Sequence, residues 1–368
     1  MKSRMALAAA AAASMTGLAH AQGSVALYGI VDEGITVVNN EGGAHNVRME
    51  SGVYRGSRWG LDGSEDLRGG MKAVFKLENG FSLDNGSLRQ GGLIFGRQAY
   101  VGVSSPYGTL TLGRQYDATT DFAWYYNVAA IASGYGFHQG DLDRTLGDRL
   151  NNSVKYRSPD FQGLSAIAMY SFSNTAGAFH QGSAWSSGVF YNHGPFTAAA
   201  AYTYLAGTTF DPYAAMGLRS FMGRPVVTRV GDVVTPVEES FALNSLGTFG
   251  VGASYAIGDV SLIANVTNTR LKYQGDATVM QVYEAGATWQ ATPALLTALA
   301  YQHTRFEGHK WHQVSLGAYY SLSKRTRMYA SVDYLKSSSG VDPVIAHDFA
   351  PSQVSWQGSA RIGVLHNF

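Results

Sequence analysis

The sequence predicts an all-β fold, a transmembrane antiparallel β-barrel of about 16 strands. Three observations predict it. Apolar and polar residues alternate through most of the chain after Ser24, short and long connections follow one another, and aromatic residues recur near the expected strand ends. The 44 glycines, 22 tyrosines and 17 phenylalanines suit a strand-rich wall with aromatic belts, and the absence of cysteine excludes a disulfide framework and a thiolate metal site.

The first 21 residues have the pattern of a secretory signal peptide. Lys2 and Arg4 precede a short apolar run, and Ala19-His20-Ala21 provides a cleavage site, so residues 22–368 form the expected barrel domain. The alternative is an N-terminal helix of the fold. Without this segment, 25 basic residues stand against 26 acidic ones, a balance that gives no case for nucleic-acid binding. No later apolar run reaches the roughly 18 residues that a membrane helix requires.

The expected strands have two unlike faces. In the first strand Val25, Leu27 and Val31 alternate with Tyr28 and Asp32. The same alternation continues through residues 58–62, 260–269 and 311–322, where apolar side chains occupy every second position. Strict alternation of this kind is typical of strands that separate two environments.

The connections suggest a barrel with two different rims. Short turns occur at Arg-Gly-Gly, Ser-Pro-Tyr-Gly, Asn-His-Gly-Pro and similar sequences. Short turns on one rim and long loops on the other are typical of outer-membrane barrels, and the 347 residues after cleavage allow about 22 for each strand and its connection. The expected long connections are residues 39–53, 84–93, 117–149, 174–184, 207–243, 274–278, 306–310 and 337–354.

The segment from residue 117 to residue 149 has no steady period of 2 or 3.6. A structureless stretch of this length inside a compact domain usually has a function. It lies between strands that carry arginines, and its acids opposite those bases would make a charged pore constriction. Its acidic residues are Asp117, Asp121, Asp141, Asp143 and Asp148.

The last expected strand ends the chain on an aromatic residue. Trp356, Ala360, Ile362 and Val364 share a face with the terminal Phe368. Pairing this strand with the first one would close the barrel and remove both free edges, so we expect Phe368 to act in barrel closure and assembly.

Several of these stretches resemble the trimeric general-diffusion porins of Gram-negative outer membranes, in particular those of β-proteobacteria. They are SVALYGIVDEG, SRWGLDGSEDLRGGMKAVFKLENGF, FGRQAYVGVSSPYGTLTLGRQYD, NNSVKYRSPDFQGLSAIAMYSF and the terminal GVLHNF. The resemblance implies a 16-stranded homotrimer in outer-membrane lipid, whose third extracellular loop folds into the lumen. It also implies passive diffusion of small hydrophilic solutes and ions, without enzymatic activity or a cofactor.

The resemblance also implies site residues. Wall arginines of the family correspond to Arg58, Arg97 and Arg149, and Arg114 corresponds to an arginine that contacts a neighbouring subunit's second loop. Strand alternation independently directs Arg58 inward. It also places Arg149 on the same strand face as Lys155, and we add Lys155 to the basic wall. For Arg97 alternation is undecided. Asp117, Asp121, Asp141 and Asp143 are the expected loop acids, although this loop lacks the Pro-Glu-Phe-Gly-Gly run of many relatives. Leu365 also stands where many relatives have a basic residue, which leaves the local lumen charge open.

Other functions remain open. One is a channel with a saturable site for anionic solutes, formed by the arginines and residues 122–126. A barrel enzyme would need a nucleophile and a base held together, and no such pair emerges. The spacing of His303, His309 and His312 matches no metal signature, so no metal site is expected. Residues 207–243 could bind a ligand, but we interpret them as an ordinary variable surface loop.

Overall fold

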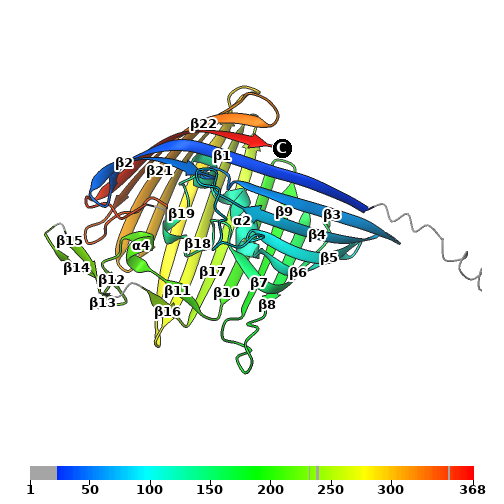
Figure 1. Ribbon diagram of the computed structural model, residues 1–368, viewed down its shortest axis with the longest axis horizontal. Helices are drawn as coiled ribbons and strands as arrows, with labels where there is room; N and C mark the ends of the chain where they lie inside the picture. The colour runs from blue at the N-terminus through cyan, green and yellow to red at the C-terminus, as the bar shows by residue number, and fades with distance from the viewer. Residues whose placement is uncertain (1–22, 232, 238–239, 347–348) are drawn as a thin grey trace, which may run out of the picture.

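The chain forms one closed antiparallel β-barrel (Figure 1). The computed structural model describes residues 23–231, 233–237, 240–346 and 349–368, so the expected signal peptide lies outside the described residues. The strands of the barrel are β1 (Gly23–Glu41), β2 (Ala44–Ser51), β3 (Arg58–Arg68), β4 (Met71–Gly80), β5 (Gln98–Ser105), β6 (Gly108–Tyr116), β7 (Arg149–Arg157), β8 (Leu164–Ser171), β9 (Ala184–His193), β10 (Phe196–Leu205), β17 (Ser245–Ile257), β18 (Val260–Tyr273), β19 (Asp276–Gln290), β20 (Leu295–Phe306), β21 (His309–Ser321), β22 (Thr326–Ser337) and β23 (Trp356–Asn367).

These 17 hydrogen-bonded segments make 16 barrel strands. Both β2 and β3 pair with β1, β3 along residues 23–30 and β2 along residues 33–41, so they are two parts of one strand interrupted at residues 52–57. Residues 30–38 of β1 also pair with residues 359–367 of β23, which closes the barrel. The predicted fold class and strand number are therefore confirmed.

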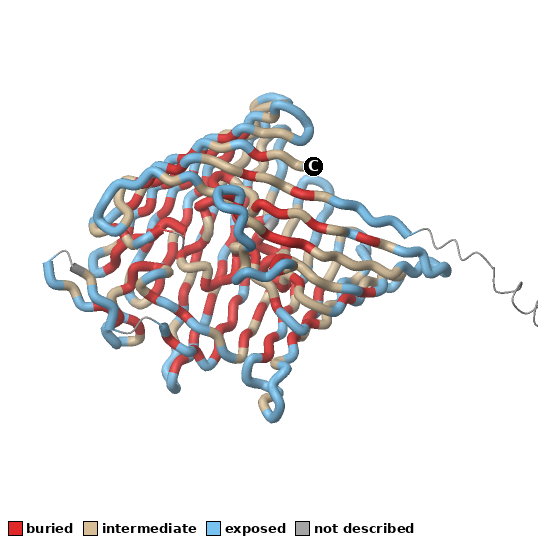
Figure 2. The backbone as a smooth tube through the Cα atoms, viewed as in Figure 1, coloured by how far each residue is buried: buried red, intermediate tan, exposed pale blue. Residues whose placement is uncertain are grey.

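The two faces of the wall are inverted relative to those of a soluble protein. Leu262 and Leu316 are 49% and 50% exposed, whereas their neighbours Ile263 and Ser315 are buried. Buried and exposed positions alternate along most strands (Figure 2). An outward apolar face and a largely polar inner face match strands that contact lipid and enclose a water-filled interior. No helix among the described residues is long and apolar enough to cross a membrane.

Three of the expected long connections are wrong, because they are two-residue turns between long strands. In place of a loop at residues 39–53, β1 continues to Glu41 and turns through Gly42 and Gly43 into β2. The connections at residues 274–278 and 306–310 turn at Gln274-Gly275 and Glu307-Gly308, all four with positive φ. Such turns suit the twist of paired strands, and the polar residues around them belong to the strand ends.

Two longer connections contain structure of their own. The β6–β7 loop, residues 117–148, contains α2 (Ala118–Tyr126), α3 (Val128–Ala132) and the 3₁₀ turn η1 (Gln139–Asp141). The β10–β17 segment, residues 206–244, contains β11 (Thr208–Phe210), α4 (Pro212–Met216), β12 (Ser220–Phe221), β13 (Arg224–Pro225), β14 (Val227–Val230), β15 (Val233–Pro236) and β16 (Phe241–Leu243).

The β10–β17 segment is not the ordinary surface loop that we expected from the sequence. Phe210, Phe221 and Phe241 are buried and pack on Phe306 and Tyr273 of the barrel strands. The inner face of β18–β22 is apolar at this rim, whereas further along the same strands it is polar. The segment therefore forms an aromatic core together with the adjoining barrel strands.

Candidate pore constriction

The β6–β7 loop is anchored to the polar face of the wall by buried charges. His138, whose side chain has no exposed surface, lies between two carboxylates, with Nδ1 2.5 Å from Asp143 and Nε2 2.6 Å from Glu284 of β19. Burial alone would lower the pKa of His138, but the two carboxylates raise it to about 10, so the imidazole is charged at neutral pH. Glu284 also accepts a hydrogen bond from the Ala129 amide of α3.

The loop approaches the wall closely at strand positions that carry small side chains. A Cβ atom added at Gly317 of β21 would lie 1.9 Å from the Ala132 carbonyl oxygen, and one at Gly250 of β17 would lie 2.7 Å from the Phe122 ring. Nearby, Ser133 donates a 2.6 Å hydrogen bond to Asp333 of β22. The helices of the loop therefore pack against β17–β22 with little space for alternative positions.

Arg58, Arg97 and Arg149 come together on the opposite side of the barrel, near Tyr116 at the end of β6. Arg97 and Arg149 each donate a hydrogen bond to the Tyr116 hydroxyl, at 2.7 and 2.9 Å. Arg97 also pairs with Glu78 of β4 at 2.8 Å. The Nε of Arg58 donates to the Gly56 carbonyl in the gap between β2 and β3. The structure thus places these three arginines in one neighbourhood.

Strand alternation does not explain how two of these arginines reach the interior. Arg97 immediately precedes β5 and lies outside its pairing, so the in-and-out order of that strand does not apply to it. The parity argument for Arg149 is wrong, because a bulge at Asn152, whose φ is +51°, shifts the order between Arg149 and Ser153. Arg149 nevertheless borders the interior cavity, with its guanidinium over the Tyr116 ring.

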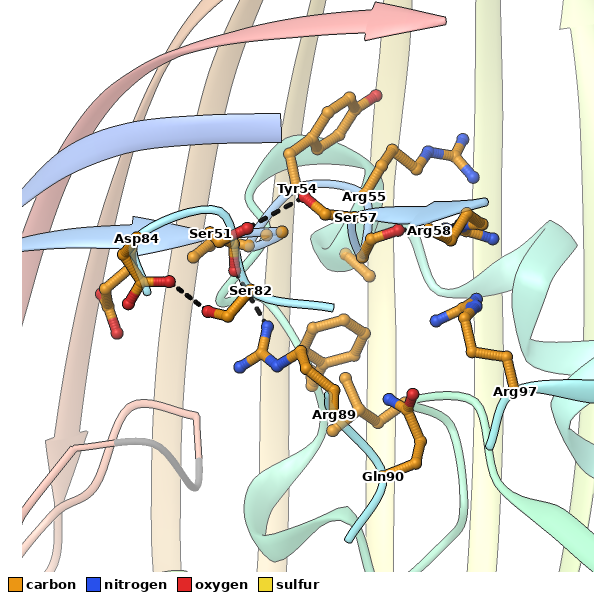
Figure 3. Close-up of a pocket in the computed structure, with 18 of the residues that line it drawn as sticks. Ser51, Tyr54, Arg55, Ser57, Arg58, Ser82, Asp84, Arg89, Gln90 and Arg97 are labelled. Carbon is orange, nitrogen blue, oxygen red and sulfur yellow. Dashed lines mark hydrogen bonds between the residues drawn. The ribbon is translucent and has the colours of Figure 1, made fainter. Parts of the chain in front are cut away.

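A cavity of about 740 Å³ separates this wall from the β6–β7 loop. The guanidinium groups of Arg58, Arg89 and Arg97 lie around the same space (Figure 3). Among the described residues, six arginines border the cavity, against two carboxylates, those of Glu50 and Asp84. The arginines are Arg48, Arg55, Arg58, Arg89, Arg97 and Arg149.

Three of the cavity arginines form hydrogen bonds to neutral oxygen atoms of the described residues. Arg58 donates to a backbone carbonyl, Arg89 donates to the Ser51 carbonyl at 2.9 Å, and Arg149 donates to the Arg97 carbonyl and the Tyr116 hydroxyl. Within the described ranges, no carboxylate lies within 4.0 Å of these three guanidinium groups. Their charges are therefore available to a solute.

The acids of the loop do not border the cavity. Asp117 caps α2 through the Thr120 amide and pairs with Arg144 of the same loop at 2.6 Å. Asp143 binds His138, as described above, and accepts a hydrogen bond from Thr267 of β18. The carboxylate of Asp141 accepts from the Leu146 amide.

Asp121 is the loop acid that meets a predicted wall base. Its carboxylate lies 2.7 Å from the Nζ of Lys155 on β7, and Lys155 also donates to the Tyr116 carbonyl. Asp148 lies 3.6 Å from Arg144 and is partly exposed. The loop thus contributes one carboxylate to the wall bases, beside the cavity rather than within its lining.

The charged and aromatic residues of this site that sequence reasoning missed include Arg48, Arg55, Arg89, Glu78 and Tyr116. Arg55 lies in the gap between β2 and β3, and its amide donates to Asp32. Arg89 comes from the β4–β5 connection and reaches the edge of β2. Glu78 could have been predicted, because it lies two residues after Lys76 and therefore on the same face of the strand. No sequence pattern indicates the strand gap that brings Arg55 to the cavity.

The remaining predicted residues lie elsewhere on the barrel. Arg114 donates to the Gly96 carbonyl at 2.8 Å and to Asn151 at 2.6 Å. Phe368 exchanges two backbone hydrogen bonds with Gly29, and its ring fills the space above that glycine. His303 and His312 stack at 4.5 Å, and the described residues contain no group of three or more His, Cys, Asp or Glu side chains arranged to hold a metal.

A closed barrel with an apolar exterior, a largely polar interior and a cavity lined by arginines defines a class of protein, the outer-membrane channel. The sequence pattern of the family described as "Gram-negative porin" matches residues 6–340, so the chain belongs to that family. It is therefore an outer-membrane porin of Gram-negative type, and proteins of this family are channels, not enzymes.

Known relatives extend over the whole barrel. An outer membrane porin protein of Bordetella pertussis is 31% identical, with 98% of this chain and 99% of the relative covered. The solved structure of an anion-selective porin from Comamonas acidovorans is 27% identical, covers 94% of this chain and 100% of its own, and has a TM-score of 0.76. The trimer form of OmpT from Vibrio cholerae is 18% identical and shares the fold. The match covers 94% of this chain and 99% of the OmpT chain, with a TM-score of 0.67.

Proposed function

We propose that this porin is a passive, anion-preferring channel whose constriction lies between the arginine wall and the β6–β7 loop. Small hydrophilic solutes and ions would diffuse through it without chemistry or energy input. In this proposal Arg58, Arg97 and Arg149 set the field in the constriction, and Asp121 and Lys155 hold one end of the loop.

The observation that carries this proposal is the charge balance of the cavity. Six arginines border it against two carboxylates, and the loop side supplies no charged lining residue. The net charge of a pore lining determines which ions enter favourably, so an excess of guanidinium groups favours anions. The related porin from Comamonas acidovorans, which is described as anion-selective, supports the same conclusion.

Assembly and export complete the proposal. We propose a homotrimer in the outer membrane, in line with the trimer form of a solved protein of the same fold. Arg114, on the same outward parity as the exposed Leu110 and Leu112, would contact a neighbouring subunit. Residues 1–21 would be removed as a signal peptide, and the backbone pairing of Phe368 with Gly29 would complete barrel closure.

The decisive experiment measures reversal potential in a planar bilayer under a KCl gradient. The triple variant Arg58→Gln, Arg97→Gln, Arg149→Gln should lose most of the wild-type preference for chloride, because it removes three guanidinium charges from one side of the cavity. Arg270→Gln is the matched control, because Arg270 is exposed on the opposite parity of β18 from the inward Thr269. A folded triple variant with wild-type selectivity would refute the site assignment.

A second candidate function is a channel with a saturable site for anions. The three arginines that have no carboxylate of the described residues within 4.0 Å favour it, because a carboxylate can form paired hydrogen bonds with a guanidinium fork. Flux measured against solute concentration separates the two functions. A linear relation indicates passive diffusion alone, whereas a plateau indicates a site that the solute occupies.

A further inference from the structure

The cavity has two chemically different sides. The wall side carries the guanidinium groups described above, whereas the loop side presents mainly apolar carbon. The polar loop residues Asn127 and Thr145 also border the cavity but are buried, at 3% and 5% exposure. Ile131 and Phe137 of the β6–β7 loop both border the cavity and are only half-buried, so their surfaces remain accessible from it. Leu146 is also half-buried and lines the same space, and Val53 from the strand gap adds further apolar surface.

The loop side is apolar because its acids are used elsewhere. Asp143 is held by His138 and Thr267 against the far wall, and Asp117 is held by Arg144 within the loop. Asp121 pairs with Lys155 outside the cavity lining. A solute between wall and loop therefore has guanidinium groups on one side and hydrocarbon on the other.

The aromatic segment that the sequence suggested as a binding surface does not supply this hydrocarbon. Phe122 and Tyr126 are 1% and 3% exposed and pack against glycines of β17. They hold the loop on the wall, so a solute cannot reach them. The accessible apolar surface comes from Ile131 of α3 and from Phe137, which follows that helix.

We infer that the constriction favours amphipathic carboxylates, anions with a compact apolar ring or branched chain, over hydroxylated carboxylates of the same carbon skeleton and charge. The carboxylate would bind the arginine side, and the apolar body would lose water against Ile131 and Phe137. A hydroxylated body would gain little there, because its hydroxyl groups would lose hydrogen bonds to water and the side chains of Ile131 and Phe137 offer none in return. This inference rests on the proposed anion preference and specifies the class of anion.

The test compares two anions that share a ring skeleton, cyclohexanecarboxylate and quinate, its tetrahydroxylated counterpart. Their permeabilities relative to chloride follow from reversal potentials with each sodium salt on one side of the bilayer. For the wild-type channel we expect cyclohexanecarboxylate to exceed quinate by about threefold or more. In the double variant Ile131→Ser, Phe137→Ser the ratio should fall towards one, whereas in Ile131→Val, Phe137→Leu it should stay close to wild type.

The outcomes distinguish this inference from the proposed function. A wild-type ratio near or below one, with chloride still preferred over potassium, overturns the inference and leaves the anion-preferring channel intact. A wild-type channel without chloride preference overturns both. Because the first comparison uses the unmodified protein, the inference can fail even if the serine variant does not fold. A high ratio that is unchanged in a folded serine variant also overturns the role of the loop surface.

Discussion

The β6–β7 loop and the β10–β17 segment are both long connections folded against the inside of one wall, but they are held by opposite means. The β6–β7 loop depends on buried polar groups, with His138 between Asp143 and Glu284 at its centre. The β10–β17 segment depends on aromatic packing around Phe221, and two arginines of the segment reach a single carboxylate, Asp342. The first mode fixes direction as well as position, because each hydrogen bond specifies a partner. Aromatic packing excludes water but does not assign each side chain a single partner or direction.

The difference follows the depth at which each connection meets the wall. At the rim the inward residues of β18–β22 are apolar, for example Leu271 and Trp311, and they provide a surface for phenylalanines. Deeper, the inward residues are Asn265, Thr267, Glu284 and other polar side chains, which offer hydrogen bonds to backbone and carboxylates. That deeper surface supplies Glu284 to His138, while Asp117 is paired with Arg144 within the loop, so the buried charges of the β6–β7 loop are matched.

The largest expected effect comes from breaking the polar anchor. Glu284→Ala removes one carboxylate from His138 and the acceptor of the Ala129 amide, and leaves a buried charge incompletely paired. We expect a loss of about 3–5 kcal/mol in the local stability of the loop. Single-channel recordings should show larger and noisier current, and hydrogen exchange at residues 127–138 should accelerate. Glu307→Ala, on the rim turn, is the control, and equal noise in both variants would contradict a specific anchor.

A smaller effect on transport is expected from the aromatic core. Phe221→Ala leaves a cavity among Phe210, Phe241 and Phe306, at a local cost of about 3 kcal/mol. Trypsin should then cleave after Arg219 or Arg229, while the reversal potential stays at its wild-type value. Phe179→Ala changes an exposed ring in another loop and should leave the cleavage pattern unaltered. Altered ion selectivity in Phe221→Ala would show that the two connections act as one unit.

The smallest effect, and the one that separates the two modes, is their response to alkaline pH. The folded-state pKa of His138 is about 10, above its ordinary value of 6.5, so its charge stabilises the anchor fully below about pH 6.5 and this stabilisation is lost as pH rises through about 10. In the β10–β17 segment, burial and Asp342 raise the pKa of Tyr213 to about 12, so its hydroxyl stays protonated through this range and keeps its hydrogen bond to Asp342.

In the wild type, current noise should therefore be greater at about pH 10.5 than at about pH 8. The trypsin sensitivity of the β10–β17 segment should be the same at both pH values. His138→Gln, which cannot carry the charge, is the control for the titration of other groups. If wild type and His138→Gln respond alike, the imidazolium does not control the loop.

The constriction was only partly predictable from sequence, and the reasons differ by residue. Arg58 was correctly directed inward because it begins a regular strand, where alternation is a local property. Arg97 and Arg149 lie next to irregular backbone, where alternation does not apply. The loop acids could be named but not placed, because their partners Arg144, His138 and Thr267 become neighbours only after the loop folds.

The sequence by itself determined the barrel, its strand number and its outward apolar face, because each of these follows from periodicity within single strands and from the need to pair every backbone group in lipid. The tertiary structure decided which charges remain at the cavity. It brought Arg55 and Arg89 there through a strand gap and a loop, and it placed Asp117 and Asp143 in internal ion pairs. Such pairings depend on contacts between residues far apart in the chain, and strand periodicity contains no information about them.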